Sequence, residues 1–149
     1  MAGAPRLAVR AIIVEAGRFL LVNAYPDKVS DLWCAPGGGV EAHASLPDNL
    51  AREVREETGL LVTPGRLLAV SEFHSEASGF HQVELFFAAT PVSTALDPAW
   101  ADPEGIVTER QWFSPAELGG VRFKPDFLPQ LAFDPPAHAI YDPLEPMIA

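Results

Sequence analysis

The sequence predicts an α+β protein built on a strand-rich body with one main helix. Segments of apolar and β-branched residues, separated by turn residues, follow one another along most of the chain. Only one long segment repeats its apolar residues with helical spacing. A chain of 149 residues with 48% hydrophobic content suits a single compact domain, residues 1–149. We therefore expect a mixed β-sheet body with few helices.

The expected strands and short helices follow in chain order. Leu7–Val14 and Arg18–Ala24 are predicted to form a hairpin around the turn at Glu15–Gly17. Further strands are predicted at Leu32–Ala35, Arg66–Phe73, Gln82–Thr90 and Gln111–Phe113, and short helices at Ser114–Leu118 and Pro125–Leu131. The tail, about residues 133–149, holds four prolines and is predicted to be irregular, lying on the body or on a partner.

The main helix is predicted at about residues 45–58. Ser45 suits the N-cap, and Asp48 stands three residues later at the capping-box position. Apolar residues recur every four positions at Leu46, Leu50 and Val54, which gives the helix one face to pack on the body. Gly59 is expected to end it.

The acidic composition limits the partners. A net charge of −10 and a pI of about 4.7 oppose binding to nucleic acids and to anionic membranes, so neither is an expected partner. No apolar segment approaches the ~20 residues of a membrane span, and residues 1–6 lack an apolar leader. An acidic protein that binds a phosphate compound usually needs a cation between the two sets of charge.

Cys34 is the only cysteine of the chain. It therefore forms no intrachain disulfide and no cysteine-based metal cage, which suits a reducing cytoplasm. Because Cys34 stands in the apolar run 32–35, we expect a buried packing residue here, with a catalytic thiol as the alternative.

Three glutamates form the main candidate site. Glu53, Glu56 and Glu57 stand at i, i+3 and i+4, so they project from one side of the helix. A solvated acidic face, with Arg52 pairing to Glu56, is the alternative. The triple glycine 37–39, expected to be a flexible turn, offers bare backbone to a close ligand. Closely grouped oxygen ligands suit Mg²⁺, with Mn²⁺ possible, and suggest a metal bridge to a polyphosphate.

Residues Gly38–Leu60 resemble the Nudix box of the MutT-like Nudix hydrolases. That box is a Gly, five residues, a Glu, seven residues, Arg-Glu, an apolar residue, any residue, Glu-Glu, any residue, Gly and an apolar residue. Gly38 and the run Arg52–Leu60 fit at every defined position. The resemblance implies the Nudix fold, a mixed β-sheet body sandwiched by helices (α/β/α), with residues 45–58 as the catalytic helix.

Ala44 is the one departure, because the box has its first Glu there. In the family this Glu supports the loop and pairs with the Arg that matches Arg52. Its absence predicts a looser loop or an Arg52 that pairs elsewhere, with Glu41 and His43 as nearby substitutes.

The resemblance also implies residue roles. Glu53, Glu56 and Glu57, with the Gly37 carbonyl, would bind the divalent ions. Arg52 would orient these glutamates. The general base would be Glu56, Glu57, Glu104 or Glu109, where the last two are alternatively plain surface charges.

Substrate contacts are expected from the glycines and the strands. Gly38 and Gly39 would approach the substrate through their backbone, and Arg10 would hold a phosphate or face solvent. Glu84 would face the site or solvent. Ring-stacking or core roles are open for Phe73, Phe80 and Trp112, and substrate or plain loop roles for His74 and His81.

The resemblance implies hydrolysis of a diphosphate bond in a nucleotide-like small molecule, such as a nucleoside triphosphate or nucleotide sugar. The alternative is a Nudix-like module that senses a nucleotide and cleaves it weakly or not at all, an interpretation supported only by Ala44. The substrate is left open, and a homodimer is possible because many relatives are dimers.

Overall fold

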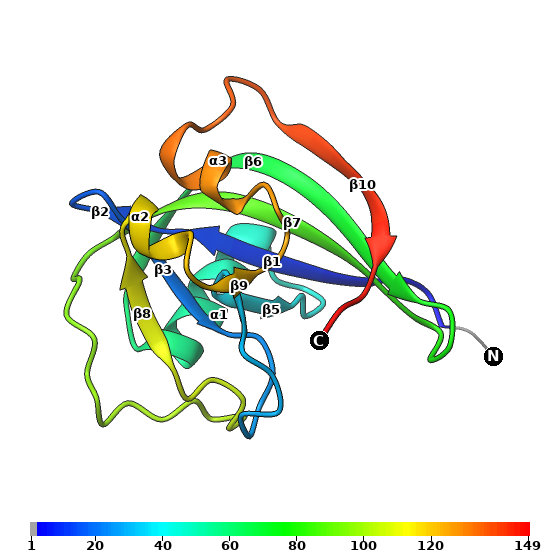
Figure 1. The fold of residues 1–149 in the computed structure, drawn as a ribbon, viewed down its shortest axis with the longest axis horizontal. Coiled ribbons are helices and arrows are strands. Elements are labelled where there is room, and N and C mark those ends of the chain that lie inside the picture. The colour runs from blue at the N-terminus through cyan, green and yellow to red at the C-terminus, as the bar shows by residue number, and fades with distance from the viewer. Residues whose placement is uncertain (1–2) are drawn as a thin grey trace.

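Two five-stranded sheets form the body of the protein in the computed structural model, which describes residues 3–149. The first sheet has the strand order β10-β6-β7-β1-β5; the second has β2-β3-β4-β9, with β8 paired to β3. Figure 1 shows the long, curved first sheet crossing the molecule. The elements are β1 Arg6–Ile12, β2 Val14–Glu15, β3 Arg18–Asn23, β4 Leu32–Cys34, β5 Gly37–Gly39, α1 Leu46–Thr58, β6 Val62–Ser75, β7 Phe80–Pro91, β8 Arg110–Phe113, α2 Pro115–Leu118, β9 Arg122–Phe123, α3 Leu128–Phe133 and β10 Ile140–Pro146.

Helices cover both faces of the first sheet, as the α/β/α prediction requires (Figure 1). On one face, Leu50 and Val54 of α1 pack with Val9, Ala11 and other apolar residues of the strands. On the other face, α2 and α3 pack through Leu118, Leu128 and Leu131 against Ile12 and Phe86. Alternate residues of β1 and β7 therefore face opposite cores.

Helix α1 begins and ends where the sequence predicts. The hydroxyl of Ser45 accepts the N–H of Asp48 over 3.1 Å, and Gly59 adopts a left-handed φ of 76° at the C-cap. Leu50 and Val54 are fully buried. Burial of these two side chains contributes roughly 1.5–3 kcal/mol each, so this face fixes α1 on the sheet and with it the direction of the glutamates.

The predicted hairpin is much shorter than expected. Only Val14 and Glu15 of β2 pair antiparallel with β3. Residues 6–12 instead form β1 of the first sheet, parallel to β7 and antiparallel to β5. A strand with Ala8, Val9 and Ala11 all fully buried needs neighbours on both edges and packing on both faces, which a hairpin with β3 would not supply.

The triple glycine is an edge strand, so its prediction as a flexible turn was wrong. Gly37, Gly38 and Gly39 pair with Arg10, Val9 and Ala8 of β1. A Cβ on Gly37 would lie 1.9 Å from the Val9 carbonyl oxygen, and one on Gly38 would lie 2.4 Å from Glu53 Oε2. Residues 37 and 38 must therefore be glycine, because the Val9 carbonyl and the Glu53 carboxylate lie too close to the backbone to leave room for a Cβ.

The proline-rich tail is also more regular than predicted. Its residues 140–146 form β10, which pairs in parallel with β6 at the edge of the first sheet. The register shifts between Asp142 and Glu145, around Pro143. An edge strand tolerates proline because one row of its N–H groups has no partner strand. The short β9 was not predicted, and within residues 3–149 no helix is long and apolar enough to cross a membrane.

Candidate active site

The three glutamates of α1 differ in their exposure. Glu53 is buried, whereas the Glu56 side chain is 29% exposed. Glu57 accepts the backbone N–H of Gly37 over 2.9 Å, so it joins α1 to β5. Burial raises the pKa of Glu57 to about 8, opposed by the charge of Arg10 and by the Gly37 N–H. Burial also raises the pKa of Glu53, opposed by Arg52.

Arg52 lies across these carboxylates. Its guanidinium donates to Glu53 over 2.8 Å and lies 3.7 Å from Glu56 and 3.5 Å from Glu41. The same group donates to Asn49 Oδ1 over 2.7 Å. With no glutamate at residue 44, Arg52 therefore pairs elsewhere, one of the two outcomes predicted. Glu41 serves as a substitute, although its side chain is 69% exposed, whereas His43 is exposed at a left-handed φ of 70°.

The donor set fits a hard divalent cation in its chemistry. Glu53, Glu56 and Glu57 offer carboxylate oxygens, the ligands that Mg²⁺ prefers. The pKa values of Glu53 and Glu57 are raised because burial disfavours their negatively charged forms. A bound cation would stabilise those charged forms. In residues 3–149, no three His, Cys, Asp or Glu side chains are gathered closely enough to hold a metal as they stand.

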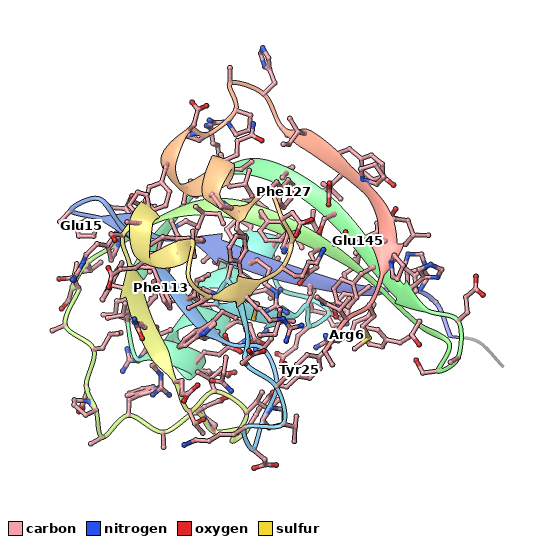
Figure 2. The ribbon with its side chains drawn as sticks, in the orientation of Figure 1. Arg6, Glu15, Tyr25, Phe113, Phe127 and Glu145 are labelled. Carbon is pink, nitrogen blue, oxygen red and sulfur yellow. The ribbon has the colours of Figure 1, made fainter. Side chains whose placement is uncertain are left out.

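A hollow of about 200 Å³ opens on the face of the first sheet opposite α1. Figure 2 labels three of its lining residues, Arg6, Tyr25 and Glu145, which come from β1, the segment after β3, and β10. Arg10 also lines the hollow, and its partner in the β1–β5 register is Gly37, which holds Glu57. The hollow and the carboxylate helix lie on opposite faces of the sheet, and the Arg10–Gly37 pair at the β5 edge links the two.

A row of polar side chains forms the floor of the hollow. Arg6 donates to Gln82, Gln82 donates to Glu84 over 3.2 Å, and Arg10 donates to the same Glu84 oxygen over 2.6 Å. Although burial acts to lower it, the pKa of Arg10 is raised by Glu84, Cys34 and Glu57, so Arg10 remains a cation. Glu84 faces the hollow, and the Arg10 side chain is only 15% exposed and does not face solvent; phosphate binding by Arg10 stays a prediction.

Apolar side chains form the walls of the hollow. Phe73 and Phe80 lie with ring centroids 5.9 Å apart, and Met147 and Ile148 of the tail lie across from the strands. Several hydrogen bonds hold the end of the tail: Tyr25 donates to the Ile148 carbonyl over 2.5 Å, the Met147 N–H donates to the His74 carbonyl over 2.8 Å, and Arg122 donates to the Ala149 carbonyl over 2.9 Å. The wall formed by the tail was not predicted from the sequence.

The other aromatic candidates lie outside the hollow. Trp112 packs against the core beneath α1 and donates to the Thr94 carbonyl over 3.3 Å. The rings of His74 and His81 are 6.0 Å apart on neighbouring strands, and His81 lies 3.8 Å from Glu72. None of the three side chains lines the hollow.

The two loop glutamates differ in position. Glu104 is close enough to Glu53 for its charge to contribute to the raised pKa of Glu53, after burial and Glu56. Glu109 lines a second hollow, with Trp33 and Gln111, and within residues 3–149 no hydrogen bond or ion pair joins its side chain to α1. Arg110, the residue after Glu109, donates to the Glu57 carbonyl, so both loop glutamates lie in segments close to the carboxylate helix.

Two residues that sequence reasoning missed fix this loop. Asp102 accepts the N–H groups of Glu104, Ile106 and Val107. Asn23 bonds to the carbonyl of Ile106 and to the N–H groups of Thr108 and Glu109. A polar residue at the end of an apolar strand, as Asn23 is, was the one available signal.

Cys34 lies beside Arg10 at the wall of the hollow. Burial raises the pKa of its thiol to about 12, with Arg10 acting in the opposite direction. A thiol that stays protonated is a poor nucleophile, which argues against the catalytic alternative. Cys34 is half-buried at the hollow, however, and is less buried than predicted.

Comparison with known proteins defines the class. The family model described as the NUDIX domain matches residues 4–131, so the chain belongs to the NUDIX family. Among solved structures, a NUDIX hydrolase from Nitrosomonas europaea superposes with a TM-score of 0.71 at 26% identity, covering 85% of each chain. A MutT NUDIX hydrolase from Burkholderia pseudomallei gives 0.66 at 26% identity, covering 77% of this chain and 87% of that one.

Two curated relatives show which activities occur nearby in sequence. The chain is 33% identical over 89 residues to the putative ADP-ribose pyrophosphatase YjhB of Bacillus subtilis (strain 168), covering 58% of this chain and 41% of that protein. It is 35% identical over 96 residues to diphosphoinositol polyphosphate phosphohydrolase 3-alpha of Mus musculus, covering 63% and 53%. The chain thus spans about half the length of these relatives.

Proposed function

We propose that the protein is a Mg²⁺-dependent pyrophosphohydrolase that cleaves a diphosphate bond in a nucleotide-like small molecule. The observation that carries this proposal is the position of Arg10. It is bonded to Glu84 in the floor of the hollow, and its electrostatic interaction with Glu57 links it to the carboxylate helix. A substrate with its organic part in the hollow would thus have its diphosphate beside the glutamates.

The chain's own residues would bind the metal and position the reacting groups. Glu53, Glu56, Glu57 and the Gly37 carbonyl would hold Mg²⁺, which when bound neutralises a diphosphate and acidifies nearby water. Arg52 would orient Glu53 by a charge-assisted hydrogen bond and Glu56 by an ion pair at 3.7 Å.

Hydrolysis also needs a base, because the attacking water must lose a proton. Candidates are Glu56 and Glu57 on α1 and Glu104 and Glu109 on the loop. Of the two loop residues, we favour Glu104, because its charge is close enough to contribute to the raised pKa of Glu53.

The charges of the hollow favour a nucleotide-like substrate over a highly phosphorylated inositol. The hollow has three basic residues and two acidic ones. Arg10 is already paired with Glu84, and Lys124 lies 3.6 Å from Glu145. A ring that carries many phosphates needs more free cations than this, whereas a base or sugar ring suits the apolar walls around Phe73 and Phe80. Between the two relatives, an ADP-ribose-like substrate therefore fits better.

A nucleotide sensor without catalysis is the weaker candidate. The sensor interpretation rested on Ala44, because the absence of a glutamate at residue 44 predicts a looser loop. The loop is instead bound through Asn49 and Arg52, and all three metal-binding glutamates are present. This arrangement removes the reason to expect a disabled site.

A substrate panel tests the proposal. The purified chain would be incubated with Mg²⁺ and ADP-ribose, nucleotide sugars, nucleoside triphosphates or a diphosphoinositol polyphosphate, with products separated by ion-exchange chromatography. We expect Mg²⁺-dependent release of a nucleoside monophosphate from at least one nucleotide and its loss in Glu57→Gln. Absence of metal-dependent turnover across the nucleotides would refute the proposal.

A further inference from the structure

A single buried amide side chain, Asn49, binds both Arg52 and the loop 41–45. Asn49 lies on α1, one turn before Glu53, and is fully buried. Its Oδ1 accepts the N–H of Glu41 over 2.8 Å and a guanidinium N–H of Arg52 over 2.7 Å. Its Nδ2 donates to the carbonyl of Ser45 over 2.9 Å and lies 3.3 Å from those of Glu41 and Ala44.

These contacts use both the donor and the acceptor of the amide. A buried amide with partners on both atoms has one preferred orientation, because exchanging its oxygen and nitrogen would set like groups against each other. Asn49 is thus a fixed point from which the loop 41–45 and Arg52 are both held. A carboxylate at residue 44 would accept from Arg52 but would have no N–H to donate to the loop carbonyls.

Holding Arg52 has a direct effect on the metal-binding glutamates. Arg52 reaches Glu53 and Glu56 with the same guanidinium that Asn49 binds. Without Asn49, its remaining partners outside that pair would be the Gly39 carbonyl at 3.4 Å and the exposed Glu41 at 3.5 Å, both longer than the 2.7 Å bond to Asn49. An arginine side chain has many rotamers, and each added bond reduces the number it samples. Glu53 and Glu56 would lose their fixed orientation together with Arg52.

We propose that Asn49 is a positioning residue of this active site, which replaces the missing glutamate at residue 44 by holding Arg52 against Glu53 and Glu56 and by binding the loop 41–45. The proposal rests on the proposed function for its effects on divalent-cation binding and on turnover. Its effect on the loop 41–45 concerns the free protein.

Two substitutions at residue 49 separate the role of Asn49 in holding Arg52 from its role in binding the loop 41–45. Asn49→Leu keeps the approximate volume and removes every hydrogen bond. Asn49→Asp keeps acceptor oxygens for Arg52 and for the Glu41 N–H but removes the donor to the loop carbonyls. Asp48→Ala, at the exposed neighbouring residue, is the matched control, because the contacts made at residue 48 come from its backbone N–H.

Three measurements apply to each variant: amide hydrogen exchange at Glu41, the Kd for Mn²⁺ by titration calorimetry, and kcat on the best nucleotide of the panel. For Asn49→Leu we expect faster exchange, at least tenfold weaker Mn²⁺ binding and at least tenfold lower kcat, the range typical of residues that orient metal ligands. For Asn49→Asp we expect Mn²⁺ binding and kcat within about threefold of the parent, and for Asp48→Ala no change.

Each result of these measurements either supports or overturns the proposal. Weak Mn²⁺ binding in Asn49→Leu with rescue in Asn49→Asp supports the proposal, even when no nucleotide is turned over. If Asn49→Leu speeds exchange at Glu41 but leaves Mn²⁺ binding and kcat unchanged, Asn49 is a loop residue alone and the proposal is overturned. Equal loss of Mn²⁺ binding in both variants overturns it too, because the acceptor for Arg52 would then not matter.

Discussion

Gly38 lies directly under the carboxylate of Glu53, so that a Cβ on residue 38 would meet Glu53 Oε2 at 2.4 Å and its Cδ at 2.6 Å. Gly38→Ala should therefore displace a buried carboxylate that we propose as a metal ligand. We expect at least tenfold weaker Mg²⁺ binding and a lower kcat, within the range seen when groups around metal ligands are disturbed. Titration calorimetry with Mg²⁺ and steady-state kinetics measure both.

Gly120→Ala is the control for this substitution. A Cβ on Gly120 would lie 3.5 Å from the Glu117 carbonyl oxygen, an ordinary contact, and Gly120 is far from the glutamates in sequence and lies between α2 and β9. Unchanged Mg²⁺ binding in Gly38→Ala would show that Glu53 moves away freely and that the contact is unimportant.

The raised pKa of Glu57 predicts a pH-dependent effect on stability. In the folded protein the Glu57 carboxyl group stays protonated up to about pH 8, whereas in the unfolded chain it loses its proton near pH 4.5. The folded state therefore loses stability relative to the unfolded state as pH rises between these values, and the loss is complete above pH 8. In metal-free protein, Glu57→Gln should be increasingly stabilising relative to the parent from pH 5.5 to pH 8.5.

Urea unfolding in EDTA at pH 5.5, 7.0 and 8.5 measures this difference, with Glu76→Gln on the exposed turn between β6 and β7 as the control. Saturating Mg²⁺ should reverse the order at high pH, because it binds the ionised carboxylate of the parent. A difference between parent and Glu57→Gln that is constant with pH would contradict the raised pKa.

The sequence predicts helix α1 accurately because its signals are local. The Ser45 cap, the apolar spacing of Leu50 and Val54 and the Gly59 stop all lie within the segment they define. The glutamates are found for the same reason, since three residues on one side of one helix need no knowledge of the remaining chain.

The hollow and its neighbours depend on contacts between distant segments. Gly37–Gly39 form a strand only because β1 pairs with them, and β10 forms only because β6 offers an edge. The three glycines at residues 37–39 predicted a turn, and the prolines of the tail predicted irregular backbone. In both segments the local sequence therefore argued against the strand that forms. Asn49 was detectable in principle, as a polar residue three positions before Arg52 on the same side of the helix, but its partners in the loop 41–45 follow only from the fold.

The Arg10–Glu84 pair predicts a large single-site effect on stability. Both side chains are mostly buried, at 15% and 7% exposure, and are joined at 2.6 Å. Arg10→Met leaves the Glu84 charge without its cation and should lower the free energy of unfolding by about 3 kcal/mol. Arg10→Met with Glu84→Gln should regain a large part of this loss, because no charge is then left unpaired.

Urea unfolding of the two single variants and the double variant gives the coupling energy of the pair. Arg122→Met serves as the control, since its ion pair with Asp31 is solvent-exposed and should contribute less than about 1 kcal/mol. Additive effects of the two substitutions at Arg10 and Glu84 would contradict the predicted coupling.

Phe73 tests whether the hollow holds the organic part of the substrate. Its ring lines the hollow beside Phe80 and lies away from the glutamates of α1, on the opposite face of the sheet. Phe73→Ala should raise KM by about tenfold and leave kcat nearly unchanged, because it removes contacts that ground state and transition state share. Val92→Ala, at an exposed residue after β7, should change neither constant. A loss in kcat with unchanged KM would place the organic group elsewhere.

Ala44→Glu tests how completely the present arrangement replaces the glutamate of the family's box. In the parent chain Arg52 already has Asn49, Glu41, Glu53 and Glu56 as partners, so a further carboxylate should change kcat by less than about twofold. In the Asn49→Leu background Arg52 lacks its Asn49 contact, and the carboxylate introduced by Ala44→Glu should restore a large part of the lost kcat. Such dependence of one substitution on another is the signature of residues that share a partner. Equal effects of Ala44→Glu in both backgrounds, measured by steady-state kinetics, would show that residues 44 and 49 act independently on Arg52.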